Sequence, residues 1–269
     1  MLRFLGAMLS LAVFNGSQST IKNSVPDLDS MLQQTKSCFN CTLPDNARKN
    51  KVIFSTQTFQ YRKLKEDYSL IYIKERSGNF YIRTARKGRP GAIMAVNKKG
   101  GWSIISNKPR KIMPTKQYNH VRISENLQLK DFKKTFASVI LANKTDIIDN
   151  KKCFKLTCTP PPELGLKPIE FWLDAKSLLL RQQKSFLYNA KTGGGSKVIK
   201  RFSDYRRSGS GREPMTMQIR FGNFIITNKI DQIIYDAKLP PELFIVPKNQ
   251  QEYLKLNRAF DQLEQSINH

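Results

Sequence analysis

Histidine is scarce in this chain of 269 residues and occurs only at positions 120 and 269. A Ser-His-Asp triad would therefore depend on His120, and no Gly-x-Ser-x-Gly elbow presents a serine to it. The His-Glu-x-x-His zinc motif, the P-loop and the Gly-x-Gly-x-x-Gly loop are also absent. Glu170 and Asp174 are the remaining catalytic candidates, because a strand would carry both on one face. Strand faces commonly carry such residues for solvation, so we expect that the protein is not an enzyme and uses no cofactor or metal.

Long hydrophobic runs are missing as well. The only extended apolar run, Phe4–Phe14, has 11 residues, and a helix that crosses a bilayer needs about 20. The basic segment Met1–Arg3 precedes the run, and the small polar segment Asn15–Ser19 follows it. This layout is typical of a secretory signal, although a buried N-terminal helix would also fit. We therefore predict a signal peptide over residues 1–19 and a protein that works outside the cytoplasm.

Acidic residues are few: 21 stand against 46 basic residues, which gives a net charge of +25. A surface of this kind attracts polyanions. For an exported protein, phospholipid head groups, lipopolysaccharide and acidic polymers are nearer than nucleic acid. The basic residues are spread along the whole chain. The alternative explanation is therefore that proteins of the source organism are generally basic in composition. We expect an anionic membrane surface as a candidate partner, and no nucleic acid.

The four cysteines are Cys38, Cys41, Cys153 and Cys158, and an even number in an exported chain indicates disulfides. The last two lie in a predicted strand, where their odd separation directs them to opposite faces. Five strand residues span about 16 Å, whereas a disulfide needs Cα atoms within about 7 Å. Cys38 and Cys41 can pair locally in a turn, or one of them can reach Cys153 or Cys158. A zinc site of the Cys-x-x-Cys type is the other interpretation.

Short apolar runs separated by turns fill most of the chain after residue 50, and this texture favours strands. The segments Arg76–Asn79 and Lys98–Gly101 are hairpin signals. No segment resembles a linker that would divide the chain. The sequence therefore predicts a mainly β, α+β fold with one large, curved antiparallel sheet. The expected strands are 51–61, 68–75, 80–84, 92–97, 102–106, 152–159, 169–174, 178–187, 197–205, 215–221 and 223–235.

Three segments show the spacing of amphipathic helices. In segment 26–36 one face carries Leu28, Met31 and Leu32. In segment 126–141 the spaced apolar residues are Leu129, Phe132, Phe136, Val139 and Ile140. In segment 250–267 they are Tyr253, Leu256, Phe260, Leu263 and Ile267.

Residues 150–247 carry several short motifs in a characteristic order. Phe171-Trp-Leu-Asp174 ends a strand, Phe202-Ser-Asp-Tyr205 lies within another, Arg212-Glu-Pro214 begins the next, and Leu239-Pro-Pro-Glu-Leu-Phe-Ile-Val-Pro247 closes the series. This order resembles the outer-membrane lipoprotein-sorting superfamily, which comprises the LolA/LolB-like periplasmic carriers and their RseB/MucB-like relatives. The first half of the chain resembles this superfamily only in its general layout, which is an export signal, a short helix and then hairpins.

The resemblance implies a half-open antiparallel β-barrel with helices capping its concave side and with acyl chains of a lipoprotein or other lipid in the hollow. Residues 20–249 would form this lipid-binding domain, and residues 250–269 an added helix that binds a partner or covers a sheet edge. The implied role is that of a periplasmic carrier between membranes. The alternative is a non-transporting sensor or anchoring module of the same fold that docks on anionic lipid or polymer.

Apolar residues of the predicted strands are candidates for the cavity wall, and methionine suits a cavity that receives flexible chains. Ordinary core packing is the alternative for each of them. The cavity candidates are Phe80, Ile82, Met94, Val96, Trp102, Ile104, Met215, Met217, Ile219 and Phe221. The lid-helix candidates are Leu28, Met31, Leu32, Leu129, Phe132 and Phe136. The family's lid-locking arginine has candidates in Arg48, Arg62 and Arg83, and no motif selects among them.

Overall fold

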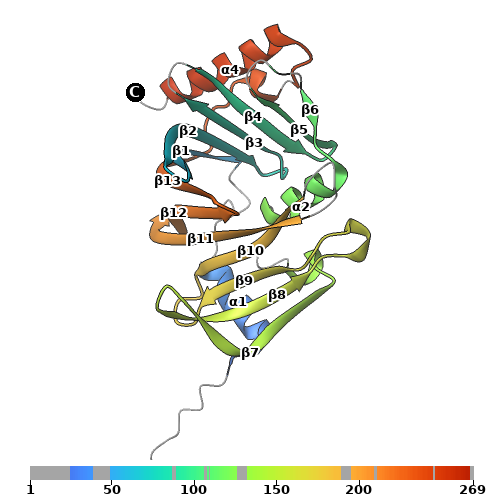
Figure 1. Ribbon diagram of the computed structural model, residues 1–269, viewed down its shortest axis with the longest axis vertical. Coiled ribbons are helices and arrows are strands. Elements are labelled where there is room, and N and C mark those ends of the chain that lie inside the picture. Colours follow the sequence, from blue (N-terminus) through green and yellow to red (C-terminus); the bar gives the residue numbers. More distant parts are fainter. Residues whose placement is uncertain are drawn as a thin grey trace, which may run out of the picture.

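The structure is a computed structural model in which 13 strands form one antiparallel sheet (Figure 1). It describes residues 25–38, 49–86, 89–105, 108, 110–125, 132–188, 195–208, 211–244 and 246–266. The strands are β1 Asn50–Tyr61, β2 Leu64–Glu75, β3 Phe80–Arg86, β4 Arg89–Asn97, β5 Gly100–Ile105, β6 Lys111–Ile112, β7 Ser138–Ile148, β8 Lys151–Thr159, β9 Ile169–Asp174, β10 Leu180–Tyr188, β11 Gly195–Ser208, β12 Gly211–Phe221 and β13 Phe224–Tyr235. The helices are α1 Leu28–Cys38, α2 Thr115–Glu125, α3 Phe132–Thr135 and α4 Gln250–Gln265, with short 3-10 turns at Pro162–Leu164 and Pro241–Phe244.

The sheet consists of two meanders joined at its centre, and its order is β6-β5-β4-β3-β2-β1-β13-β12-β11-β10-β9-β8-β7. The joint is the antiparallel pairing of β1 with β13, which runs from Lys51 opposite Tyr235 to Tyr61 opposite Phe224. Both edge strands, β6 and β7, therefore come from the middle of the chain, on either side of α2 and α3. The described strands do not close into a barrel, and the predicted large antiparallel sheet is confirmed.

Helices cover both faces of this sheet. Helices α1, α2 and α3 contribute buried residues to the clusters on one face, here called the inner face. Helix α4 covers the opposite, outer face of β1 to β5. The largest inner cluster consists of Met31, Leu32, Ile123, Phe132, Phe136, Leu156, Cys158, Ile169, Phe171, Leu173 and Leu178. A second inner cluster consists of Phe80, Val96 and Met113, with Tyr118 and Val121 of α2 packed against it.

Helix α4 belongs to the hydrophobic core of the sheet. Its predicted apolar stripe is confirmed for Tyr253, Leu256, Phe260 and Leu263, which are all buried in the outer cluster; residue 267 lies outside the described residues. The helix begins because Asn249 caps it by accepting a hydrogen bond from the Glu252 N–H. We expected this helix to bind a partner or to cover a sheet edge, and the structure places it across a sheet face.

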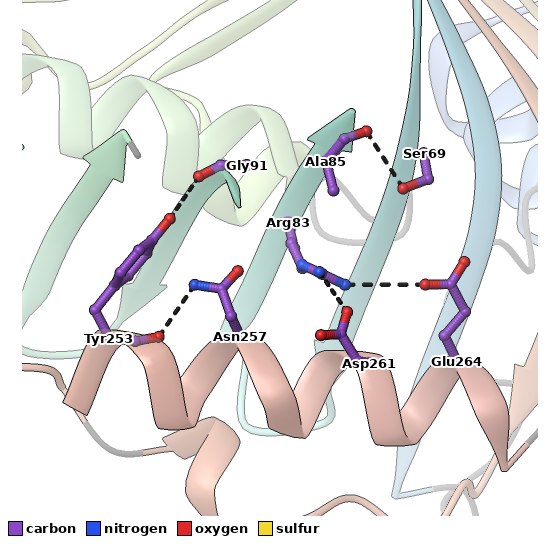
Figure 2. Close-up of polar contacts among 8 residues, drawn as sticks. All are labelled: Ser69, Arg83, Ala85, Gly91, Tyr253, Asn257, Asp261 and Glu264. Carbon is purple, nitrogen blue, oxygen red and sulfur yellow. Dashed lines mark hydrogen bonds and ion pairs between the residues drawn. The ribbon is translucent and has the colours of Figure 1, made fainter. Parts of the chain in front are cut away.

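Polar contacts fix α4 on the outer face, as Figure 2 shows. The Arg83 guanidinium of β3 lies 2.5 Å from the Asp261 carboxylate and 3.9 Å from that of Glu264. The Tyr253 hydroxyl donates to the carbonyl oxygen of Gly91 in β4 at 2.7 Å. A Cβ at Gly91 would lie 1.3 Å from the Thr84 carbonyl oxygen, so the close approach of β3 and β4 there requires glycine. These contacts set the position of α4 along the strands.

The prediction of one helix over residues 126–141 was wrong for its second half. Only Phe132–Thr135 is helical, and β7 begins at Ser138; residues 126–131, with Leu129, lie outside the described residues. In β7, Val139 and Leu141 pack against the inner cluster while Ile140 between them is 60% exposed. This alternation has the period of a strand, and β-branched residues favour strands. The spacing of Phe132 and Phe136 is helical, but the helix was wrongly predicted to continue to residue 141.

Helix α2 was not predicted, because few apolar residues mark its buried side. Tyr118, Val121 and Ile123 pack inward, and His120 is also buried. The Tyr118 hydroxyl donates to the carbonyl oxygen of Asn97 at 2.7 Å, which ties the helix to the end of β4. Tyrosine and histidine in these positions weaken the helical periodicity on which the sequence prediction depends.

Candidate functional site

The candidate site is the inner face of the central strands. Residues that lie directly opposite one another in a sheet point to the same face. One row of such partners crosses six strands, from Phe171 through Gln183, Lys200, Ile219 and Ile226 to Phe59. Phe171 belongs to the inner cluster, so the whole row faces inward. The sheet thus presents one continuous inner surface between the packed regions at its two sides.

The register places eight of the ten cavity candidates on this inner face: Phe80, Ile82, Met94, Val96, Met215, Met217, Ile219 and Phe221. The other two, Trp102 and Ile104, lie opposite Ala95 and Ile93 and pack beneath α4 on the outer face. The structure therefore brings the candidates of β3, β4 and β12 to one surface and separates those of β5 from it.

Burial divides the inner face into packed and accessible parts. Phe80 and Val96 are 0% and 1% exposed beneath α2. On the central strands the inward apolar side chains are only half-buried. We call these the inner strip, which consists of Phe59, Met215, Met217, Ile219, Phe221 and Ile226. A fully plugged core would bury such residues almost completely, so the strip is apolar surface that the described part of the chain leaves partly open.

The two ends of the inner strip differ in chemistry. At one end four aromatic rings cluster: Phe224 lies 5.0 Å from Phe221, 4.4 Å from Tyr61 and 5.5 Å from Phe59 between ring centroids. At the middle of the strip the Gln57 amide donates to the Asn228 side-chain oxygen at 3.0 Å.

The other end holds a buried ion pair. Lys51 Nζ lies 2.5 Å from Glu213 Oε1, and the two side chains are 6% and 5% exposed. The Tyr235 hydroxyl donates to the same carboxylate oxygen at 3.4 Å. Sequence reasoning missed this pair, because 162 residues separate its members. The inward position of Lys51 in a strand of alternating pattern is the only local signal that the sequence carries.

The predicted lid residues are firmly packed. Met31 and Leu32 of α1 are 0% and 6% exposed, and they share a cluster with Phe132 and Phe136 above β8 and β9. Leu28 packs against the same cluster. These residues therefore cover the inner face on one side of the inner strip, and α2 covers it on the other side, above Phe80.

Cys153 and Cys158 are free thiols. Cys153 and Cys158 are both completely buried and unbridged, so the bridge from either one to Cys38 or Cys41 is not formed. As predicted, they face opposite sides: Cys158 packs in the inner cluster, and Cys153 pairs in register with Asp174 on the outer face. The predicted local disulfide between Cys38 and Cys41 involves Cys41, which lies outside the described residues. Among the described residues, no group of three or more His, Cys, Asp or Glu is placed to hold a metal ion.

Both thiols are expected to resist alkylation in the native protein. Burial raises the pKa of Cys153 to about 11 and that of Cys158 to about 12. At pH 8 this lowers the thiolate fraction of each by about a hundredfold or more relative to an ordinary cysteine. Iodoacetamide labelling followed by peptide mass spectrometry, with and without urea, measures this. Rapid native labelling of either thiol would contradict the burial.

Glu170 and Asp174 share the outer face of β9 as predicted, but each has its own cationic partners. Glu170 forms ion pairs with Lys155 and Lys184. Asp174 pairs with Arg181 at 3.2 Å and accepts the backbone N–H groups of Lys176 and Ser177 at 3.1 and 2.9 Å. Burial raises the pKa of both carboxyls, yet these contacts outweigh it and hold each pKa below its ordinary value. Neither carboxyl is kept protonated as a general acid would be, and both serve as structural anchors.

The depressed pKa of Asp174 predicts a pH-dependent contribution to stability. Such a group stabilises the fold above its unfolded pKa of about 3.9, and the contribution is lost as pH falls through the lower folded pKa. Asp174→Asn is therefore expected to lower the free energy of unfolding by about 1–2 kcal/mol at pH 7 and by much less at pH 3. Urea unfolding at the two pH values tests this. Asp149→Asn, which removes a half-exposed partner of Arg201, is the control and should change little at either pH.

Comparison with known proteins identifies the fold. No family model matches the chain, and no curated protein matches it in sequence. A LolA superfamily protein from Nitrosomonas europaea is 10% identical with a TM-score of 0.57, covering 82% of this chain and 99% of its own. A DUF1329 family protein from Desulfovibrio piger is 12% identical with a TM-score of 0.57, covering 81% and 95%. A putative outer membrane lipoprotein-sorting protein domain from Vibrio parahaemolyticus is 11% identical with a TM-score of 0.51, covering 80% and 94%.

The protein therefore has the fold of the LolA superfamily, as the order of its motifs predicted. At identities of 10–12% the likeness extends to the fold alone. In the part of the chain that the structure describes, no helix is both long and apolar enough to span a membrane.

Proposed function

We propose that the protein binds the acyl chains of a lipoprotein or another lipid against its inner strip and carries them between membranes of the envelope, in the periplasm and without catalysis. The supporting observation is the partial exposure of apolar side chains on β12, β13 and β1, between regions of the same face that helices bury completely. The LolA-superfamily fold agrees with this role.

Hydrophobic burial supplies enough free energy for such binding. An acyl chain gains about 0.8 kcal/mol for each methylene removed from water, so eight carbons gain roughly 6 kcal/mol. Met215 and Met217 add flexible side chains to the strip, and methionine adapts to chains of varied shape. The aromatic end around Phe224 offers rigid apolar surface. The strip therefore combines flexible methionine side chains with a rigid aromatic cluster at one end.

Two neighbouring isoleucines of β13 provide a matched test. Ile226 belongs to the inner strip and lies opposite Phe59, whereas Ile225 faces outward opposite Gln60, and both are half-buried. Ile226→Gln is expected to weaken binding of a fluorescent fatty acid about tenfold, because it exposes an amide to the acyl chain. Ile225→Gln has the same chemistry and should leave the affinity unchanged. Equal effects of the two variants, or no uptake by the parent protein, would refute the proposal.

Lipid transfer separates a carrier from a non-transporting module of the same fold. Native mass spectrometry of protein purified from the periplasm, followed by lipid extraction, is expected to show co-purified acyl lipid. A carrier should also move labelled lipid from donor to acceptor vesicles, with Ile226→Gln slower than Ile225→Gln. Bound lipid without transfer would favour a sensor or an anchoring module.

A further inference from the structure

The longest stretch of the chain without an acidic residue is strongly basic. Glu75 and Glu125 are successive acidic residues, and the 49 residues between them contain 12 lysines and arginines. This segment forms β3, β4, β5, β6 and most of α2. It therefore forms the last strands at one end of the sheet, from β3 to the edge strand β6 (Figure 1).

Among the described residues, at least two of these cations pair with carboxylates from outside the segment. Arg83 pairs with α4, and Arg86 pairs with Glu66 at 2.9 Å. Other cations stand exposed near the sheet edge, namely Lys98 and Lys99 in the turn before β5 and Arg110 and Lys111 at β6. The turn and β6 are neighbours, because the Met113 N–H donates to the carbonyl oxygen of Gly101 at 2.8 Å. The edge thus carries positive charge, and the segment that forms it contains no acidic residue.

Two large apolar side chains protrude at the same edge. Ile112 of β6 is 68% exposed, and Ile105 at the end of β5 is 51% exposed. Ile112 pairs in register with Trp102, whereas Ile105 pairs with Ala92, so they lie on opposite faces of the β5–β6 ribbon. The edge therefore presents an isoleucine on each face, with cations beside them.

We propose that this β5–β6 edge docks on an anionic phospholipid bilayer. Ile105 and Ile112 enter the boundary between head groups and acyl chains, and the flanking cations bind the lipid phosphates. Apolar side chains ringed by lysine and arginine are the combination that holds a protein at a membrane surface. A soluble polyanion or a nucleic acid would use the cations but would leave the isoleucines in water. The proposal is independent of acyl-chain binding by the inner strip.

The opposite sheet edge provides the control. Ile140 and Ile147 of β7 are each 60% exposed, as prominent as the isoleucines of the β5–β6 edge. However, Asp146 in β7 and Asp149 in the turn after it offset part of the charge of the neighbouring Lys144, Lys151 and Lys152. The β7 edge thus matches the β5–β6 edge in exposed isoleucine and differs in charge, so only the β5–β6 edge is expected to bind anionic lipid.

Co-sedimentation of the full chain with vesicles tests the proposal. We expect binding to vesicles of phosphatidylcholine with phosphatidylglycerol, and little binding to phosphatidylcholine alone. Ile112→Asn should weaken binding about tenfold, because it removes an inserted side chain. Arg110→Gln combined with Lys111→Gln should weaken it about 25-fold, since each cation near an anionic surface is worth roughly fivefold. Ile140→Asn on the β7 edge should leave it unchanged.

Each outcome decides the proposal. If Ile112→Asn binds as the parent does while the double charge variant loses binding, the interaction is that of a general polyanion surface and the membrane proposal fails. If Ile140→Asn weakens binding as much as Ile112→Asn does, the β5–β6 edge is not the contact. All four residues are exposed, so circular dichroism spectra should be unchanged in every variant. Failure here with normal fatty-acid uptake would leave the proposed function standing.

Discussion

Glu213→Gln is expected to lower the free energy of unfolding by about 3–5 kcal/mol, because it leaves the Lys51 ammonium buried without a counter-charge. The two side chains are almost inaccessible to solvent, and Glu213 also accepts a hydrogen bond from Tyr235. Water therefore cannot replace the lost carboxylate, and the desolvation of the buried ammonium is left without compensation. Urea unfolding at neutral pH measures the change.

The double variant Lys51→Met with Glu213→Gln distinguishes a pair from two independent residues. Removing both charges is expected to recover most of the lost stability, because well-packed neutral groups often equal or exceed a buried ion pair. Arg86→Gln breaks the exposed pair with Glu66 and should cost less than about 1 kcal/mol. A loss in Glu213→Gln that resembles this surface control would mean that the pair is not desolvated.

The ion pair also bears on ligand binding, because it lies at one end of the inner strip. If acyl chains bind along the strip, the neutral double variant should still take up fatty acid, since the strip residues of β12 and β13 are unchanged. The charges and the apolar strip are thus separable by mutation, one acting on stability and the other on binding.

Local patterns of the sequence were sufficient to predict most of the strands and two of the helices. Ile169–Asp174 has the predicted bounds, and the stripe of α4 packs as its spacing indicated. These elements have a clear period of two or 3.6 residues, and turn residues mark their ends. The mixed pattern around Phe136 and Val139 failed because the period changes within a few residues, where a short helix gives way to a strand.

The inner face was only partly predictable. The alternation of Trp102 and Ile104 shows that they share a face, but the register of the β4–β5 hairpin decides which one. The turn pairs Val96 with Gly101, and Trp102 therefore lies beside Ala95 on the outer face. The pairing of β1 with β13 joins residues that are 163 to 184 positions apart, and no local signal specifies it. This pairing places Phe59 and Ile226 together and completes the inner strip.

Phe260→Ala in α4 is the second large effect that we expect, a loss of about 3–5 kcal/mol in the free energy of unfolding. Phe260 is completely buried in the outer cluster between α4 and the strands. Its ring also lies 5.8 Å from the Arg83 guanidinium carbon, so truncation removes a cation–π contact together with the hydrophobic packing. Phe260→Leu should recover part of the loss because it refills much of the cavity.

Leu254→Ala is the matched control on the same helix, because Leu254 is 41% exposed, and a change of less than about 0.5 kcal/mol is expected there. At a temperature where Phe260→Ala remains folded, it should still bind fatty acid with the affinity of the parent protein, since α4 lies on the face opposite the inner strip. Stability measured by urea and uptake measured by fluorescence would then change independently. A parallel loss of both in the folded variant would show that the packing of α4 also determines the shape of the inner surface, and the two faces would have to be treated as one coupled unit.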